Sequence, residues 1–435
     1  MLDEKAFYRT AATLSFRDVG EDQVKIMNTM YGSGFTGPQA ILEILRFSEE
    51  PKSLEQLRCE FEGTEDDVFE LLIRESLIID EASYRRLTPG LMRGVSNNVG
   101  VARAPHELSR TSALPGFAII GAGTDVATLG LPGARFGPEL VRGAAMFRFG
   151  GELPVSDGEE VAADVVRTTH VLDLERRRRV DVSSIEVVDL GDVVKVGGEP
   201  MADYGFRLSR VTRMALEAGY TPIVIGGDHS ISRYPLEVFA QRHTETGFGI
   251  IHFDAHHDLY PSFGDEVTHA NPFREVMKTS SVRYLFQVGL RMIEPLRDPA
   301  AFRCDVDDRI QYVSALELSE LKAAEVFAKL PRDLPCYLTF DVDCMSPTIC
   351  PETGTPTAGG LSYYQAFRLI EHVASTFHCV GADFVEVAAS PAKYNAAAVT
   401  VMSLISRFLL AHAKSEPLST YVQTRLPDPR VPAPR

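Results

Sequence analysis

Short runs of apolar, β-branched residues recur between residues 117 and 385, and segments with helical spacing separate several of them. The runs lie at 117–121, 185–190, 222–226, 248–253, 283–289, 336–342 and 379–385. The helical segments include 205–218, 316–329 and 393–413. Strands that alternate with helices form a parallel sheet covered by helices on both faces. We therefore predict an α/β fold, with any ligand site beyond the carboxyl ends of the strands.

Residues 1–80 are predicted to form a separate small domain. Strands are expected at 13–19 and 77–79, and a helix at 38–47. Ser53 and Thr64, each followed three residues later by an amide or an acid, mark the starts of two further helices. A strand, three short helices and a strand, in this order, predict a winged-helix-like α+β domain.

The remaining boundaries follow from composition. Residues 81–115 mix polar residues with Gly, Pro and Asn and are predicted to be a linker. The α/β domain is expected at 116–413, and 414–435 is expected to be a Pro-rich C-terminal tail. The 435 residues exceed the length of one average domain, which agrees with two units.

Charge and hydropathy exclude several partners. The net charge of −16 argues against nucleic acid. No apolar run approaches the ~20 residues of a membrane span, and the N-terminus lacks a signal pattern, so we expect a cytoplasmic protein without a membrane partner. The six cysteines form no CxxC pair, and reduced thiols are expected.

Polar clusters follow three of the predicted strands. They are GGDHS at 226–230, DAHHD at 254–258 and DVD at 341–343. Side chains two positions apart on a strand point the same way, so alternate residues of the last two clusters are expected on one side of the sheet. With the histidine of the first cluster they give two imidazoles and four carboxylates: His229, Asp254, His256, Asp258, Asp341 and Asp343.

Four carboxylates cannot lie together partly buried without compensation, because like charges would force several to bind protons. The cluster is therefore either solvated and spread out or neutralised by cations. Mixed imidazole and carboxylate ligands suit manganese better than a thiolate-loving metal. Two divalent ions would balance the carboxylates and make water reactive at neutral pH. His252 is expected to be a core histidine, and His257 is expected to face away.

These clusters resemble those of the ureohydrolase family of arginases and agmatinases, over roughly residues 115 to 413. Further shared pieces are PGARFGP at 132–138 with Arg142, DLGD at 189–192, GLR at 289–291, GTP at 354–356, GGL at 359–361 and VEV at 385–387. The resemblance implies an arginase-like eight-stranded parallel sheet flanked by helices, and a homo-oligomer. It also implies a centre of two Mn²⁺ ions, or of another divalent metal, that hydrolyses a guanidinium group to urea and an amine.

The resemblance implies a role for each site residue. The metal ligands would be His229 and Asp258 for one ion and His256 and Asp343 for the other, with Asp254 and Asp341 bridging. Asp258 would also pass a proton to the leaving amine, His269 would shuttle protons and contact the substrate, and Glu386 would hold the guanidinium. Tyr260 stands where arginases acting on the free amino acid carry an asparagine that contacts the α-carboxylate. This candidate substrate contact favours agmatine-like or peptide-bound guanidines.

The N-terminal unit resembles PqqD-like recognition elements of ribosomal-peptide biosynthesis, which capture a leader peptide as an added strand. Joined to a ureohydrolase, it implies a peptide arginase that converts arginine residues of a precursor peptide to ornithine, with the leader bound by residues 1–80.

Three alternatives stay open. The first is a small-molecule ureohydrolase acting on agmatine, arginine or a guanidino acid. The second is a non-catalytic arginase-fold binding protein. The third is a zinc amide hydrolase on the related deacetylase fold, which would need one catalytic metal rather than two.

Overall fold

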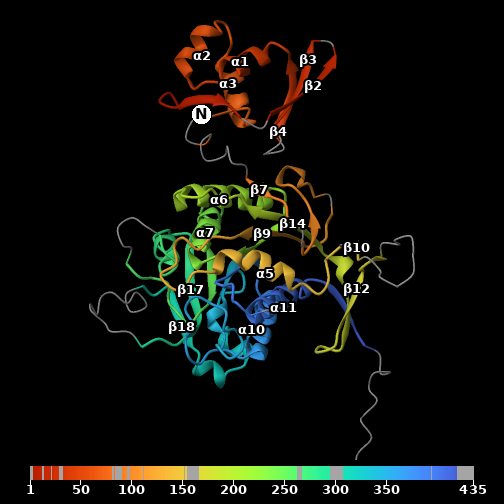
Figure 1. The fold of residues 1–435 in the computed structure, drawn as a ribbon, viewed down its shortest axis with the longest axis vertical. Coiled ribbons are helices and arrows are strands. Elements are labelled where there is room, and N and C mark those ends of the chain that lie inside the picture. The colour runs from red at the N-terminus through yellow and green to blue at the C-terminus, as the bar shows by residue number, and fades with distance from the viewer. Residues whose placement is uncertain are drawn as a thin grey trace, which may run out of the picture.

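The computed structural model describes most of the chain between residues 3 and 418 (Figure 1). The residues outside the description are 1–2, 12–13, 21, 29–32, 81–82, 84–90, 96–97, 111, 151, 154–165, 262–266, 294–306, 393 and 419–435. Among the described helices, none combines the length and apolarity of a membrane span. The described cysteines are free thiols, and all of them except Cys59 are buried.

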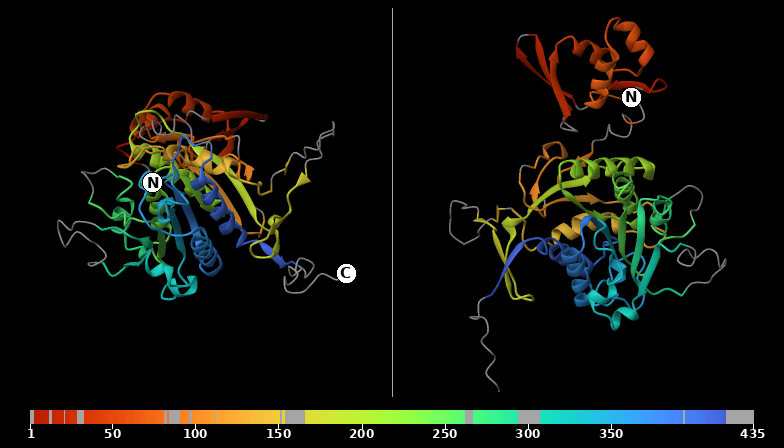
Figure 2. Two further views of the ribbon diagram at one scale, coloured as in Figure 1. Left: turned by 60° about the horizontal axis from the view of Figure 1, so that its bottom comes forward. Right: turned by 180° about the vertical axis from the view of Figure 1, so that it is seen from behind.

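A large sheet forms the centre of the molecule (Figure 2). In spatial order its main strands are β18 (Ile310–Ser314), β17 (Val282–Leu290), β16 (Phe248–Phe253), β19 (Cys336–Asp341), β20 (Cys379–Val385), β15 (Thr221–Gly226), β9 (Gly116–Ala122) and β14 (Glu186–Val193). These eight neighbours pair in parallel. The predicted α/β fold with an eight-stranded parallel sheet is confirmed, although β18 was not predicted.

Helices cover both faces of this sheet. One face packs against α5 (Gly137–Gly143), α10 (Tyr363–Thr376) and α11 (Ala396–Leu410). The other packs against α6 (Met201–Glu217), α7 (Arg233–Arg242) and α8 (Pro272–Val276). Side chains alternate along β9, so that Ile119 faces the first layer and Ile120 the second. Burial on both faces explains why these strands are apolar along their whole length.

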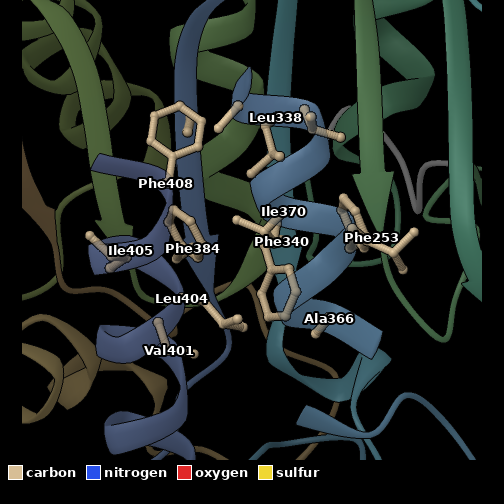
Figure 3. Close-up of a cluster of buried hydrophobic side chains, with 14 of the residues drawn as sticks. Phe253, Leu338, Phe340, Ala366, Ile370, Phe384, Val401, Leu404, Ile405 and Phe408 are labelled. Atoms are coloured by element: carbon tan, nitrogen blue, oxygen red, sulfur yellow. The ribbon is translucent and has the colours of Figure 1, made fainter. Parts of the chain in front are cut away.

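Figure 3 shows the apolar layer between the sheet and helices α10 and α11. Phe340 and Phe384 from neighbouring strands lie here with ring centroids 5.7 Å apart, and both are fully buried. The long helix predicted at 316–329 is wrong. The chain forms only the 3-10 turn η7 (Glu317–Ser319) and the short α9 (Ala323–Val326), which ends before Phe327, a buried ring that packs against Phe253 and Phe286.

The N-terminal residues form two small sheets and three short helices. The elements are β1 (Phe7–Thr10), β2 (Leu14–Gly20), β3 (Gln23–Asn28), β4 (Ser33–Pro38), α1 (Ile41–Phe47), β5 (Lys52–Ser53), α2 (Leu54–Glu60), α3 (Asp66–Arg74) and β6 (Ile78–Asp80). Ser53 caps α2 in a capping box with Gln56, as predicted. The cap predicted at Thr64 is wrong, because α3 begins at Asp66 after Glu65 and no side chain caps it. The sheet order β2-β3-β4 was not predicted.

Two segments expected outside the α/β domain add strands beside it. Within the expected linker, β7 (Met92–Arg93) pairs antiparallel with β14, and β8 (Val101–Ala102) pairs parallel with it. The expected tail starts with β21 (Lys414–Pro417), which pairs with β13 (Arg178–Asp181) of a hairpin whose first strand is β12 (His170–Asp173). A second hairpin joins β10 (Glu152–Leu153) to β11 (Val166–Arg167).

A buried ion-pair cluster fixes the β14 edge of the sheet. Arg142 of α5 donates to both carboxylate oxygens of Asp189, at 2.9 and 3.0 Å, and to Asp192 at 2.5 Å. Asp189 also accepts the backbone N–H of Val99 at 2.9 Å. This bond fixes the segment 81–115, which the sequence predicted to be a linker, to the sheet. The side chain of Arg142 is 1% exposed. This cluster gives Arg142 and the DLGD segment a structural role.

Replacing Asp189 by asparagine is expected to destabilise the protein by about 1.5–3 kcal/mol, because it weakens the charge-assisted bonds to the buried Arg142 and leaves Asp192 as its one charged partner in this cluster. Denaturant unfolding of the purified variant measures this. Arg93→Ala is the matched control: Arg93 pairs with Asp192 from a side chain that is 72% exposed, so its loss should cost below about 1 kcal/mol. Equal effects of the two substitutions would contradict the structural role of the cluster.

Candidate metal centre

The three predicted polar clusters meet at the carboxyl edge of the sheet. His229 begins the 3-10 turn η4 (His229–Ser232) after β15, the DAHHD segment follows β16, and DVD joins the end of β19 to the turn η8 (Val342–Cys344). Strands β16, β19, β20 and β15 are consecutive neighbours in the sheet. Because parallel strands end at the same edge, residues more than a hundred positions apart become adjacent.

One group of ligand atoms surrounds the His229 ring. Its Nδ1 atom lies 3.2 Å from Asp254 Oδ2, 3.0 Å from Asp258 Oδ2 and 3.2 Å from Asp341 Oδ2. All four side chains are buried, and Nδ1 has no hydrogen-bond partner among the described residues. The Nε2 atom of the ring instead contacts Thr339 Oγ1 at 2.9 Å. With the proton on Nε2, the Nδ1 lone pair faces three carboxylate oxygens, an arrangement that a cation between them would stabilise.

A second group lies beside the first and shares Asp254 with it. His256 Nδ1 is 3.0 Å from Asp343 Oδ2 and 3.3 Å from Asp254 Oδ1. Asp254 therefore presents one oxygen to each group, which fits a bridging ligand. Asp341 contacts the first group only, because its Oδ1 atom accepts the backbone N–H of Asp343 at 2.8 Å as the cap of η8. Among the described residues only Asp254 has contacts with both groups; Asp341, expected as a second bridging ligand, contacts the first group alone.

The backbone that brings the three clusters together is not the extended strand on which the prediction from side-chain alternation relied. β16 ends at Phe253 and β19 ends at Asp341, so most of the ligand atoms come from turns beyond the strands. Asp258 has a φ of 51°, in the left-handed region that few non-glycine residues adopt. The six residues meet as expected, but an extended backbone does not place them.

Burial of these acids has a large electrostatic effect. Burial and the neighbouring charges of Asp343 and Asp254 raise the pKa of Asp341 well above its usual value, and the pKa of Asp343 is raised by burial and Asp254. Burial lowers the pKa of His256, but hydrogen bonds to Asp254 and Asp343 outweigh it and raise this pKa to about 12. Without a cation the centre therefore retains protons. Ligand atoms of His229, His252, Asp254 and Asp258 lie within 4.8 Å of one another, and so do those of Asp254, His256 and Asp343. Two such groups of imidazoles and carboxylates fit a pair of divalent cations, with Asp341 beside the first group.

His252 supports the centre from behind. Its Nε2 atom lies 2.8 Å from Asp254 Oδ2 and its Nδ1 atom lies 2.9 Å from Gln287 Nε2. Gln287 Nε2 is a donor, since it also bonds the carbonyl of His257 at 2.7 Å. His252 Nδ1 is then the acceptor, and its Nε2–H donates to Asp254. The expected core histidine thus also orients a predicted metal ligand.

His257 and Tyr260 lie together beside this centre. His257 Nδ1 accepts the backbone N–H of Leu259 at 2.9 Å, as expected for a ring that faces away from the ligands. The Tyr260 ring packs on it, with centroids 4.3 Å apart. Substrate contact by Tyr260 stays a prediction.

Glu386 and His269 lie directly beside His229. Glu386 Oε1 accepts the backbone N–H of His229 at 2.9 Å and lies 3.0 Å from His269 Nδ1. Leu129 donates its backbone N–H to His269 Nε2 at 2.9 Å, so His269 carries its proton on Nδ1 and donates to Glu386. Glu386 Oε2 is buried without a hydrogen-bond partner among the described residues. The site therefore presents one free carboxylate oxygen beside the predicted metal ligands.

Sequence reasoning missed several residues that shape the centre. Thr355 donates to Asp343 Oδ2 at 2.9 Å. Asp228 accepts the backbone N–H groups of Ala127 at 3.0 Å and Ser230 at 3.1 Å, and burial and Glu386 raise its pKa to about 7. A side chain at Gly227 would place Cβ 1.9 Å from a backbone oxygen, so only glycine fits there. These residues lie within the GTP and GGDHS segments, which were the available signal.

Comparisons with known proteins give a consistent result. The model of the arginase family matches residues 115–411. An agmatinase of Neisseria meningitidis is 30% identical over 301 residues, which cover 68% of this chain and 87% of the relative. An agmatinase of Escherichia coli is 28% identical, covering 74% of this chain and 96% of the relative. The solved proclavaminate amidino hydrolase of Streptomyces clavuligerus superposes with a TM-score of 0.55 at 26% identity, covering 69% of this chain and 95% of that one.

Binding of divalent cations is expected to release protons. Because the pKa of His256 is about 12 in the cation-free protein, its imidazole is protonated at neutral pH and must lose a proton to become a ligand. Apparent affinity for Mn²⁺ should therefore rise as the pH rises from 6 to 8. Titration calorimetry in buffers with different ionisation enthalpies measures the released protons. Binding without proton release would contradict this electrostatic account.

Proposed function

Because the chain belongs to the arginase family, we propose that it is a manganese-dependent ureohydrolase that cleaves a small guanidine such as agmatine to urea and an amine. The agmatinase relatives favour this substrate class over the peptide that the N-terminal sequence suggests. The single observation that carries the proposal is the free, buried Oε2 atom of Glu386 beside two groups of metal-ligand atoms.

Glu386 is the proposed binding group for the guanidinium. Its Oε1 atom is held by the backbone of His229 and by His269, so the carboxylate cannot turn away. Its Oε2 atom is left to accept a charge-assisted hydrogen bond from a guanidinium N–H. Four aspartates balanced by two divalent ions have no net formal charge, so the negative charge of Glu386 makes the site suitable for a cationic substrate.

His229, Asp254, Asp258 and Asp341, with His256 and Asp343, would hold two divalent ions, which would supply a nucleophilic oxygen from water at neutral pH. Glu386 holds the guanidino carbon in place for attack. The bond from this carbon to the alkyl nitrogen then breaks, and the water oxygen leaves in urea. Asp258, whose Oδ2 lies 3.0 Å from His229 Nδ1, is the proposed proton relay: its carboxylate accepts a proton from the attacking water and passes it to the nitrogen of the leaving amine. His269 keeps Glu386 oriented through its Nδ1–H.

Replacing Glu386 by glutamine is expected to lower kcat/KM for agmatine about 10- to 150-fold, since a hydrogen bond to a charged group contributes roughly 1.5–3 kcal/mol. Urea release in the presence of Mn²⁺ measures the effect. Glu139→Gln, at an exposed position of α5, is the matched control and should leave activity unchanged. If the wild-type protein releases no urea from agmatine, the small-molecule substrate is wrong.

A groove in the N-terminal domain favours a second candidate, hydrolysis of arginine side chains in a peptide. The groove has a volume of about 690 Å³ and lies between β2 and α1. Within the described residues β2 pairs only with β3, which leaves its other edge open. Phe16 of β2 lies opposite the buried Ile26 and shares its face, yet it is 53% exposed. An extended peptide added along β2 would cover it.

The net charge of the N-terminal domain is suited to binding a cationic peptide. Residues 1–80 carry 17 acidic and 8 basic side chains, and this excess attracts an arginine-containing chain. The groove itself is lined by both signs, with Arg46 and Glu49 among its residues. A peptide bound here would deliver its arginine side chains to the same hydrolytic centre.

Replacing Phe16 by aspartate is expected to raise KM for an arginine-containing peptide at least tenfold and to leave KM for agmatine unchanged. Ornithine formation in the peptide and urea release from agmatine measure the two. Val19→Asp, at an exposed β2 position that does not line the groove, is the control. If the wild-type protein forms no ornithine in any peptide offered, or if the Phe16 variant keeps its peptide KM, the second candidate is excluded.

A further inference from the structure

A buried hydrogen-bonded relay contacts the nitrogen of His229 that points away from the carboxylates. His229 Nε2 lies 2.9 Å from Thr339 Oγ1, and Thr339 Oγ1 lies 2.6 Å from Asp383 Oδ1. Tyr337 completes the relay by donating its hydroxyl to Asp383 Oδ2 at 2.9 Å. Thr339 and Asp383 are register partners on the adjacent strands β19 and β20 and are fully buried.

The donors in this relay have a definite direction. Both oxygens of the Asp383 carboxylate accept hydroxyl groups, so the single hydroxyl proton of Thr339 is directed to Asp383. Thr339 Oγ1 can then only accept from His229, which places the imidazole proton on Nε2. In the neutral ring, the form that binds a cation, the lone pair therefore lies on Nδ1, the atom that faces Asp254, Asp258 and Asp341. Partners of this kind fix the tautomer and the ring orientation of a metal-binding histidine.

The other histidine of the centre lacks such support. His256 Nε2 contacts Thr357 Oγ1 at 3.3 Å, and Thr357 is half-buried rather than enclosed. The side chain of His256 is 19% exposed, against 1% for His229. The two groups of ligand atoms therefore differ in how firmly their histidines are held.

We propose that Thr339 and Asp383 are positioning residues that set the affinity of one cation position, the one at His229, by fixing the tautomer and orientation of this histidine. This inference rests on the proposed metal centre. A substitution at Thr339 should therefore affect the His229 position and not the His256 position, because His256 Nε2 contacts Thr357 and not Thr339.

Mn²⁺ binding to four metal-free proteins tests the proposal: wild type, Thr339→Val, Thr339→Ser and Thr357→Val. Competition with a chelator gives two dissociation constants per chain, and the visible spectrum of bound Co²⁺ reports the ligand geometry. We expect Thr339→Val to weaken one position about 10- to 100-fold. Thr339→Ser, which keeps the hydroxyl, should bind Mn²⁺ as the wild type does. Thr357→Val should leave the affinity of the His229 position unchanged.

The unfolding midpoint of each metal-free protein shows whether the variant folds. If Thr339→Val does not fold, Thr339→Ala replaces it, because alanine and serine at this position differ only by the hydroxyl. If the valine or alanine variant binds Mn²⁺ with the same two dissociation constants as the wild type, Thr339 does not position His229. The ureohydrolase proposal would be unaffected by that result. Failure of the wild type to bind two Mn²⁺ ions per chain overturns the proposed centre itself.

Discussion

The burial of four carboxylates around two imidazoles is the constraint on which the rest of this structure depends. Asp254, Asp341 and Asp343 are almost fully enclosed, and their mutual repulsion raises the pKa of Asp341 well above its usual value, in addition to the effect of burial. Such a group is stable only with protons or cations between the oxygens. The arrangement of ligand atoms around Asp254 favours cations. The site is thus built to hold metal ions. The free-energy cost of burying its carboxylates is offset by the packing of the surrounding core.

Backbone geometry at the sheet edge shows a related cost. Asp258 and Glu386 have φ values of 51° and 65°, and a left-handed residue other than glycine costs roughly 1–3 kcal/mol. At Glu386 the backbone N–H is bonded to Gly227 at 2.8 Å and the carboxylate is held by two donors, so its surroundings fix this conformation. Three other described non-glycine residues, Asp22, Ser76 and Arg177, also have a positive φ and lie away from the site. Asp258 and Glu386 differ from them in that the strained backbone carries side chains of the candidate site, which agrees with a site selected for function rather than for stability.

The two candidate substrates share one centre and differ only in what brings the guanidine to it. A small guanidine needs no more than the residues of the arginase-family domain, whose model matches residues 115–411. A peptide would use the open edge of β2 and the acidic N-terminal domain as well. The N-terminal residues have a hydrophobic cluster of their own, which includes Leu54, Leu57 and Phe69. They therefore add a possible binding surface without altering the hydrolytic chemistry.

The sequence by itself determined the parallel sheet and the identity of the six clustered residues. A continuous apolar run in the sequence indicates a strand that is buried on both faces of a sheet. The residue types at 229, 254–258 and 341–343 set the charges that metal ions or protons must balance. It did not reveal β18, whose residues are buried only at Ile310 and Val313, or the break of the helix expected at 316–329. Only the tertiary structure decided that Asp254 serves both ligand groups, that His252 supports it, and that Thr339 and Asp383 hold His229. These contacts depend on β16, β19, β20 and β15 being neighbours and on the rotamers of buried side chains, and local sequence patterns encode neither.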